Sequence, residues 1–314
     1  MSHPESYTAY AFTKKGGPLE KISVKWTDPK AGQIVIKVIA CGVCHSDCEV
    51  QSQRFPGGLP RVPGHEIIGE IVAIGPGEEK YYKMGQRVGG GWHGVTMDGG
   101  YAEYATLRTE AVVPIPEDMD PIETAPLLCA GITTFNSLRN MDVQPGDVVA
   151  VQGIGGLGHL ALQFSKAMGF RTVALSSSGS KEEMAHKLGA TDYVDGSKVD
   201  QVDALQDLGG AKVVVCTAPN SKVIENLIGG LKVGGKLLIL GLPEGPATVR
   251  LDLMITKRLS IIGWPSGHAK DSEDTVMFAK QAGIHTMVEK YPLDKAQEAF
   301  DHLAAARFRA VIVP

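Results

Sequence analysis

Side chains of the types that bind transition metals stand at three separated places in this chain. Cys44 follows a Gly-Val turn, His65 and Glu66 follow a Pro-Gly pair, and Cys129 ends an apolar stretch. A zinc ion that does chemistry needs about three protein ligands and one open position. Mixed sulfur and nitrogen donors favour zinc over magnesium or calcium. We therefore predict that Cys44, His65 and Cys129 bind zinc. Glu66 is either a fourth ligand when no substrate is present or a base beside the metal.

The surroundings of these residues separate them from ordinary buried cysteines and histidines. A lone buried cysteine is usually a small apolar residue, and we interpret Cys41 and Cys216 in that way. His65 instead lies in a Gly-His-Glu turn after a proline, which suits a rigid platform for a ligand better than a core helix. Asp47 is expected to hold the other ring nitrogen of His65. The alternative for Asp47 is a solvated carboxylate in a turn.

A second chemical signal follows Cys129 along the chain. The apolar stretch 148–152 runs into Gly153-Ile154-Gly155-Gly156-Leu157-Gly158, and a segment of helical length comes next. In this context Gly153 permits the tight turn, Gly155 lets a pyrophosphate approach the backbone, and Gly158 allows close packing of helix on strand. The free N–H groups at the start of the helix complete an anion site. We predict a dinucleotide-binding turn that includes Gly156 and Leu157.

The end of the next expected strand indicates which dinucleotide binds. NAD sites place an Asp or Glu about 20 residues after the glycines, where it binds the ribose 2′-hydroxyl. Here the strand ends in Ser176, Ser177 and Ser178, with Lys181 behind them. No carboxylate stands in this stretch to repel a 2′-phosphate, whereas three hydroxyls and an ammonium can bind one. We therefore predict NADP(H) rather than NAD(H); the alternative is a serine-rich turn with a solvated lysine.

Composition limits the class of protein. A length of 314 residues favours about two domains, and 43% apolar with 21% charged residues is ordinary for a globular chain. The net charge of −4, without a basic block, disfavours nucleic acid and anionic membranes as partners. We find no transmembrane stretch and no secretory signal. Five cysteines, three of them within eight positions, suit metal chemistry in the reducing cytoplasm better than a disulfide framework.

The pattern of elements predicts a mixed α/β fold with three parts. Residues 1–130 are rich in short strands and turns. Residues 131–263 alternate strands and helices, which implies a doubly wound parallel sheet. Residues 264–314 are expected to return to the first domain, with a final strand at 309–313. The expected strands of the parallel sheet lie at 148–152, 171–175, 192–194, 213–216, 237–240 and 260–263.

The motifs together resemble the zinc-dependent medium-chain alcohol dehydrogenases, over essentially the whole chain. The resemblance is nearest to the cinnamyl and microbial alcohol dehydrogenase branch. Three stretches carry it: Cys41-Gly42-Val43-Cys44-His45-Ser46-Asp47, Pro63-Gly64-His65-Glu66 and Pro126-Leu127-Leu128-Cys129-Ala130-Gly131. A set of two cysteines and one histidine is the one already known for alcohol dehydrogenases, so that ligand count follows from precedent. The family implies a GroES-like catalytic domain split around a Rossmann domain.

The resemblance also implies roles for further residues. Ser46 is assigned to a proton relay, since its hydroxyl lies two residues after Cys44 and can reach the substrate oxygen; a turn-capping serine is the alternative. His45 occupies a position that often meets the cofactor pyrophosphate. The histidine that ends the relay in some members is replaced by Glu49. Residues expected to line the cofactor cleft by resemblance are Thr133, Gly241, Leu242 and Arg309.

One departure from the family is large. Family members usually carry a lobe with four closely spaced cysteines that binds a second, structural zinc. Here Gly94 runs straight into Val95, and no cysteine lies nearby. We therefore predict one zinc only. Either the lobe is absent, or residues are missing from the sequence between Gly94 and Val95.

The predicted function is reversible hydride transfer between a primary or secondary alcohol and NADP(H), in an enzyme that is a dimer or tetramer. Trp92, Phe55 and the segment around Trp264 are expected to form the substrate pocket, and their large apolar side chains suit aromatic or medium-chain aldehydes; the alternative for the tryptophans is a role in the core. A zinc-free quinone reductase would lack the cysteine–histidine set, and a non-catalytic nucleotide-binding member would show a damaged site. Polyol or formaldehyde oxidation is a further alternative with similar chemistry. The physiological substrate and the direction of the reaction are not fixed by the sequence.

Overall fold

A computed structural model describes residues 3–55, 57–91, 94–243, 245–304 and 308–314. The chain divides into two compact units. The first unit combines Met1–Cys129, His268–Lys280 and His285–Pro314, and the second combines Ala130–Gly267 with Gln281–Ile284. The second unit therefore extends to Gly267 and includes a short later segment, whereas the expected boundary is at 263. Each unit is built around its own hydrophobic core.

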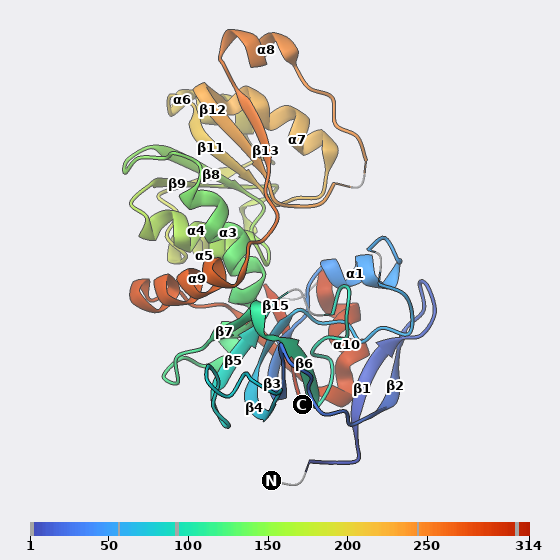
Figure 1. Cartoon of the computed structure of the whole chain (residues 1–314). Helices are drawn as coiled ribbons and strands as arrows, with labels where there is room; N and C mark the ends of the chain where they lie inside the picture. Colours follow the sequence, from blue (N-terminus) through green and yellow to red (C-terminus); the bar gives the residue numbers. More distant parts are fainter. Residues whose placement is uncertain (1–2, 56, 92–93, 244, 305–307) are drawn as a thin grey trace. The chain divides into compact units, whose positions relative to one another are not determined.

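The second unit is a six-stranded parallel sheet. Its strands are β8 (Val148–Gln152), β9 (Arg171–Ser176), β10 (Asp192–Asp195), β11 (Ala211–Cys216), β12 (Leu231–Ile239) and β13 (Ser260–Gly263). They lie in the order β10-β9-β8-β11-β12-β13 (Figure 1). This is the order of the doubly wound dinucleotide-binding fold, in which ligands bind where the order reverses. The reversal here lies between β8 and β11, so the glycine turn after β8 stands at the expected point.

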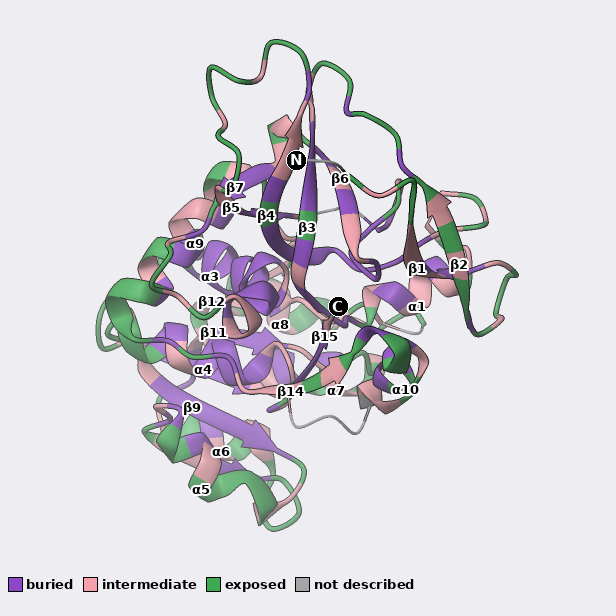
Figure 2. Cartoon of the chain, turned by 90° about the horizontal axis from the view of Figure 1, so that it is seen from below, coloured by how far each residue is buried: buried purple, intermediate pink, exposed green. Residues whose placement is uncertain are grey.

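The parallel strands are apolar because helices cover a sheet of this kind. Val149, Ala150 and Val151 of β8 are fully buried, as are Val213, Val214 and Val215 of β11. Figure 2 shows β9 as buried, whereas α5 and α6 carry exposed residues. The helices of the unit are α3 (Ala130–Arg139), α4 (Gly158–Ala167), α5 (Glu182–Lys187), α6 (Gln201–Asp207), α7 (Ser221–Leu227) and α8 (Leu251–Thr256).

Strand β12 is longer than the stretch 237–240 expected from the sequence. It begins at Leu231 and continues through Gly234 and Gly235. Glycine disfavours a strand interior, which is why the sequence pattern places its start too late. The register of β11 against β12 shifts between Ala211 and Val213, so the glycines coincide with an irregularity in the ladder.

The first unit contains a seven-stranded sheet and a separate hairpin. The hairpin joins β1 (Ser6–Phe12) to β2 (Leu19–Lys25) in antiparallel register (Figure 1). The sheet runs β14-β15-β3-β4-β5-β7, with β6 also paired to β3. Its strands are β3 (Gln33–Gly42), β4 (Glu66–Ile74), β5 (Arg87–Gly90), β6 (Tyr104–Arg108), β7 (Val112–Pro114), β14 (Val288–Pro292) and β15 (Arg309–Val313). Strands β3 and β4 are buried along most of their length (Figure 2).

Most of the C-terminal segment belongs to the first unit, whereas 264–267 and 281–284 belong to the second. Strand β15 pairs with β14 in parallel and with β3 in antiparallel register. Ala310, Val311 and Ile312 are fully buried in it. The α-helices associated with this unit are α1 (Ser46–Gln51), α2 (Pro121–Thr124), α9 (Ala269–Ala282) and α10 (Ala296–Asp301). All of them are short except α9. Among the described residues, no helix is both long and apolar enough to cross a bilayer.

Candidate metal and cofactor sites

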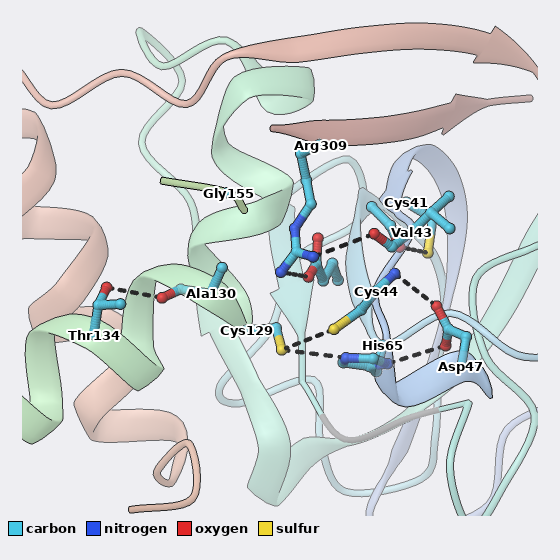
Figure 3. A network of polar contacts seen from close by, with 12 residues as sticks. Cys41, Val43, Cys44, Asp47, His65, Cys129, Ala130, Thr134, Gly155 and Arg309 are labelled. Carbon is cyan, nitrogen blue, oxygen red and sulfur yellow. Dashed lines mark hydrogen bonds and ion pairs between the residues drawn. The ribbon is translucent and has the colours of Figure 1, made fainter. Parts of the chain in front are cut away.

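The pairing of β3 with β4 brings the first candidate ligands together. Gly42 at the end of β3 pairs with Glu66 at the start of β4. Cys44 follows the end of β3 by two residues, and His65 precedes β4 by one. Cys129 lies directly before α3 and joins them at the same place (Figure 3). Three stretches that are far apart in sequence therefore converge because two antiparallel strands share one end.

The distances within this group suit a shared metal ion. The Sγ atoms of Cys44 and Cys129 are 3.7 Å apart, and His65 Nε2 lies 3.2 Å from Cys129 Sγ. With a carboxylate oxygen of Glu66 included, the four ligand atoms lie within 4.8 Å of one another. Two sulfur atoms bound at about 2.3 Å to one tetrahedral zinc would be about 3.8 Å apart. The donor set and its spacing therefore fit zinc.

Asp47 contacts His65 and the Cys44 backbone (Figure 3), and it also accepts hydrogen bonds from Gly64 and Tyr101. Its Oδ1 atom lies 3.2 Å from His65 Nδ1 and accepts a hydrogen bond of 3.2 Å from the Gly64 N–H. Its Oδ2 atom accepts from the Cys44 N–H and from the Tyr101 hydroxyl, both at 2.9 Å. Asp47 is fully buried, so the solvated alternative is wrong. The contact through Nδ1 leaves His65 Nε2 directed at the cysteines.

The electrostatics of the group favour a thiolate at Cys44. The hydrogen bond from Cys129 holds the pKa of the Cys44 thiol well below its ordinary value, and the charges of Arg309 and His65 add to the effect. A thiolate is the form of cysteine that binds metals. The cluster therefore presents a ligand in its metal-binding protonation state.

Glu66 and Arg309 form a buried pair beside the sulfur atoms. Arg309 Nη2 lies 3.0 Å from Glu66 Oε1, and its Nη1 donates to the Val43 carbonyl at 3.4 Å. Neither Glu66 oxygen accepts a hydrogen bond from the described residues. Burial raises the pKa of Glu66 to about 8, although the Arg309 charge opposes this. The Glu66 carboxylate is thus buried with an ion pair but without a hydrogen bond from the described residues, and a metal ion could satisfy its free acceptor sites.

Glycine backbones brace the segment that carries His65. Gly64 has a φ of +97°, and a Cβ atom there would lie 2.5 Å from the Tyr101 ring and 2.6 Å from Cys41 Sγ. A Cβ on Gly94 or Gly99 would press into the Gly64 backbone. The Gly99 and Gly100 amides donate to the carbonyls of Val62 and Gly64, at 2.8 and 2.9 Å. The Gly-His-Glu turn is therefore a rigid platform because chain segments pack against it without side chains.

A tight turn stands where the family places its four-cysteine lobe. The Gly94 N–H donates to the Met97 carbonyl at 2.8 Å, and Val95 is buried in the core of the first unit. The backbone thus turns directly after Gly94. Within the described ranges, Cys44, His65, Glu66 and Cys129 are the one group of three or more ligand side chains placed to share a metal.

Ser46 and His45 lie at the start of α1, next to the cluster in sequence. His45 is exposed and Ser46 is half-buried. The N-terminus of α1 has no side-chain cap, and the Ser46 hydroxyl makes no hydrogen bond with the described part of the chain. A capping role for Ser46 is therefore not supported, and its hydroxyl is available to another partner.

The glycine turn of the second unit has the geometry its sequence predicts. A Cβ on Gly158 would overlap the Gly153 carbonyl oxygen, whereas no atom stands within 4 Å of one on Gly155. Gly153 has a φ of +86°. Thr217, at the end of β11, closes the turn from the other side, since its Oγ1 donates to the Gln152 carbonyl at 2.8 Å. The sequence patterns did not single out Thr217.

The turn after β9, residues 176–181, is called the serine turn. Positively and negatively charged side chains both lie at it. Lys181 Nζ donates to the Ile154 carbonyl at 2.8 Å, so the ammonium is held against the glycine turn. Asp195 pairs with Ser176 in the β10–β9 register, and its Oδ2 atom would lie 2.9 Å from a Cβ on Gly179. The expectation that no carboxylate is available here is therefore wrong, because β10 supplies one from the neighbouring strand. Asp195 is already engaged, with Lys198 at 3.2 Å and the Ser197 hydroxyl at 2.6 Å.

The remaining predicted residues are distributed over both units. Ser177 is exposed and Ser178 half-buried in the turn, whereas Ser176 is buried at the end of β9. Thr133 is buried on α3, and a Cβ on Gly241 would lie 2.5 Å from the Thr217 carbonyl oxygen. Leu242 is 51% exposed after β12. Arg309 lies in the first unit beside Glu66 rather than in the unit that carries the glycine turn.

The expected pocket residues are not brought together within one unit. Phe55 packs against the hydrophobic core of the first unit, and Trp264 is half-buried in the second. Trp92 lies outside the described residues. The first unit does contain a cavity of about 390 Å³, lined in part by Tyr7, Trp26 and Tyr104. None of the four candidate ligands lines this cavity.

Comparisons with known proteins identify the family. The model described as "Alcohol dehydrogenase GroES-like domain" matches residues 30–117, and the one described as "Zinc-binding dehydrogenase" matches residues 156–282. The chain is similar to alcohol dehydrogenase patD of Penicillium expansum, with 47% identity over 335 residues that cover 98% of each protein. An alcohol dehydrogenase of Geobacillus stearothermophilus is 35% identical, over 90% of this chain and 91% of the relative. The structure matches a cinnamyl alcohol dehydrogenase of Sorghum bicolor with a TM-score of 0.88 and 26% identity, over 98% and 97% of the two chains.

The chain therefore belongs to the zinc-type medium-chain alcohol dehydrogenase family. It is an oxidoreductase of the alcohol dehydrogenase class, with the GroES-like and Rossmann-like domains predicted from the sequence. The alignment with the Penicillium protein is longer than the 314 residues of this chain. This chain must therefore carry gaps relative to that protein, which agrees with a missing internal segment.

The buried carboxyl group of Glu66 gives a pH dependence that can be measured in metal-free protein. Between the ordinary pKa of 4.5 and the raised value of about 8, the folded chain keeps a proton that the unfolded chain has lost. The free energy of unfolding therefore falls as pH rises, by up to about 1.4 kcal/mol per pH unit. Glu66→Gln removes this contribution, so the variant should gain stability relative to wild type between about pH 5 and about pH 8.

The measurement is the midpoint of urea unfolding of metal-free proteins across this pH range. Glu20→Gln, at an exposed carboxylate on β2, is the control and should follow the wild-type curve. Parallel curves for wild type and Glu66→Gln would contradict the raised pKa.

Proposed function

We propose that this protein is a zinc-dependent alcohol dehydrogenase and aldehyde reductase that prefers NADP(H). The observation that carries the proposal is the convergence of Cys44, His65, Glu66 and Cys129 within 4.8 Å, with Asp47 holding the far side of the imidazole. A zinc-free reductase or a non-catalytic member would have no reason to keep this set. The glycine turn after β8 supports a dinucleotide as the second participant.

The chemistry of the proposal divides between the bound groups and the chain. When bound, zinc acts as a Lewis acid on the alcohol or carbonyl oxygen, and the nicotinamide carries the hydride. Cys44, His65 and Cys129 hold the metal, and Glu66 is either a fourth ligand or a nearby base. Arg309 stabilises the Glu66 carboxylate by charge at 3.0 Å, so Arg309 acts against the cost of burying that group.

Ser46 is proposed to move the proton. Its hydroxyl is half-buried, follows Cys44 by two residues and has no partner among the described residues. In the oxidation direction the hydroxyl could accept the substrate's proton while passing its own proton on toward solvent, and in the reduction direction the same transfers would run in reverse. His45 is exposed beside it and is proposed to meet the cofactor pyrophosphate. The position that ends the relay in some relatives is Glu49, which lies 3.3 Å from the Arg54 guanidinium.

The preference for NADP(H) rests on the charges of the serine turn. Lys181 is held at the glycine turn by the Ile154 carbonyl, and the Ser178 hydroxyl contacts that of Ser180 at 2.9 Å. Carboxylates beside this turn include Asp195, which is paired with Lys198, and Glu182 and Glu183 at the start of α5, of which Glu183 is paired with Lys187. Pairing reduces the repulsion of a phosphate by Asp195 and Glu183. The local balance therefore favours an anion. Cofactor contacts are also proposed for Thr133, Gly241, Leu242 and Arg309.

The remaining parts of the proposal follow the family. The substrate is a small primary or secondary alcohol, or the matching aldehyde or ketone. One zinc per chain is proposed, because the described residues contain one group of ligand side chains placed to share a metal. The five cysteines are free thiols, which supports a reducing compartment such as the cytoplasm. A homodimer or homotetramer is proposed from the family alone.

The direct test combines metal analysis with cofactor oxidation over a panel of aldehydes. The purified protein should contain one zinc per chain and should oxidise NADPH in the presence of at least one aldehyde. Its kcat/KM for NADPH should exceed that for NADH. A ratio below one sinks the cofactor proposal, and a protein active without zinc sinks the metal proposal.

Lys181→Ala tests the cofactor preference at one side chain. A charged hydrogen bond contributes about 1.5–3 kcal/mol, so kcat/KM for NADPH should fall about 10- to 100-fold. The value for NADH should stay unchanged. Lys187→Ala is the matched control, because Lys187 is an exposed lysine on α5 that pairs with Glu183. Equal losses with both cofactors would show that Lys181 does not contact the 2′-phosphate.

Ser46→Ala tests the proton relay. Removing a group that transfers a proton in the transition state costs about 10²- to 10⁴-fold in rate, so kcat should drop severely while the zinc content stays at one per chain. Ser52→Ala, near the end of the same helix with its hydroxyl on the Glu49 carbonyl, is the control. An unchanged kcat in Ser46→Ala would remove Ser46 from the mechanism.

A further inference from the structure

Tyr101 is a fully buried tyrosine that neither the motifs nor the family resemblance singled out. It follows Gly99 and Gly100, and its N–H donates to the Pro63 carbonyl at 3.2 Å. A Cβ on Gly64 would lie 2.5 Å from its ring, so the ring packs against the residue that precedes His65. Tyr101 has no exposed surface. Its hydroxyl therefore needs an internal partner.

That partner is the carboxylate of Asp47, on the side away from His65. The Tyr101 hydroxyl donates to Asp47 Oδ2 at 2.9 Å. The other oxygen of the same carboxylate contacts His65 Nδ1 at 3.2 Å. A chain of contacts thus runs from the Tyr101 hydroxyl through Asp47 to the imidazole, and from the imidazole Nε2 to Cys129 Sγ at 3.2 Å.

We propose that Tyr101 is a positioning residue of the metal centre, which fixes the Asp47 carboxylate so that His65 presents Nε2 to zinc. The inference rests on the proposed zinc site and extends it by one residue. Each Asp47 oxygen receives two donors. Of the two on Oδ2, only Tyr101 comes from outside the Cys44–Asp47 turn. Without it, Oδ2 keeps a single local N–H, and the carboxylate can rotate away from the imidazole.

The size of the effect follows from the behaviour of groups that orient metal ligands. Loss of such a partner costs about 10- to 100-fold in metal affinity. Tyr101 acts through Asp47 and not directly on the histidine, so we expect about a 10-fold rise in the zinc dissociation constant. The ring keeps its packing when only the hydroxyl is removed, which makes phenylalanine the informative replacement.

The experiment measures zinc affinity of the full chain by competition with a chromogenic chelator, for wild type and Tyr101→Phe. Tyr82→Phe is the matched control, since the Tyr82 hydroxyl donates to the Thr109 carbonyl at 3.0 Å in the same unit. The control should leave the dissociation constant unchanged. The visible absorption of cobalt-substituted protein provides a second readout, and its bands should shift in Tyr101→Phe alone.

A double-mutant cycle shows whether Tyr101 acts through Asp47. Asp47→Asn should weaken zinc binding at least as much as Tyr101→Phe, and the double variant should be no weaker than Asp47→Asn. Additive losses, or wild-type affinity and spectrum in Tyr101→Phe, overturn the inference while the zinc proposal stands. A wild-type protein that binds no zinc overturns both. If Tyr101→Phe does not fold, Tyr101→Trp is compared with Tyr101→Leu, because tryptophan keeps a ring with an N–H donor and leucine does not. Equal zinc affinities of these two variants overturn the inference.

Discussion

A buried carboxylate sets the constraint on which the first unit depends. Asp47 is removed from water, and a charge in that position is tolerated only when hydrogen-bond donors replace the solvent. Its four donors come from the Cys44 turn, the Gly64–His65 turn and Tyr101. Satisfying this one group therefore requires three segments of chain to meet, and two of them carry candidate metal ligands. The need of the Asp47 carboxylate for hydrogen-bond donors therefore helps to place both the candidate metal ligands and the core residues around them.

The charges around the sulfur atoms show a related balance. The buried charge of Arg309 is unfavourable unless anions lie beside it, and burial makes the charged form of Glu66 unfavourable. These costs offset each other while the two side chains stay 3.0 Å apart. When bound, a divalent cation would add positive charge to that already provided by Arg309 and His65. Because Arg309 is the first residue of β15, the C-terminal strand supplies this charge.

Local patterns predict well the parts of this protein that depend on residue type and short spacing. The glycine turn can be predicted because each glycine meets a steric need within the turn itself. The empty space beside Gly155 is consistent with the expected approach of a pyrophosphate. The candidate ligands were recognised from their turns. The contributions of Tyr101, Asp195 and Thr217 were missed because each depends on which strands become neighbours. Asp195 reaches the serine turn only through the β10–β9 register, and no pattern within its own segment indicates that. The early start of β12 was missed because glycines within a strand resemble a break.

The pairing of Gly42 with Glu66 links two positions that belong to different motifs. Any Cβ at position 42 would occupy the space of the Glu66 carboxylate. A larger residue at 42 is thus compatible only with a shorter side chain at 66, or with a carboxylate displaced toward the metal. Positions 42 and 66 should therefore vary together among homologous sequences. The space that the Glu66 carboxylate can occupy depends on Gly42, the residue paired with it on the neighbouring strand.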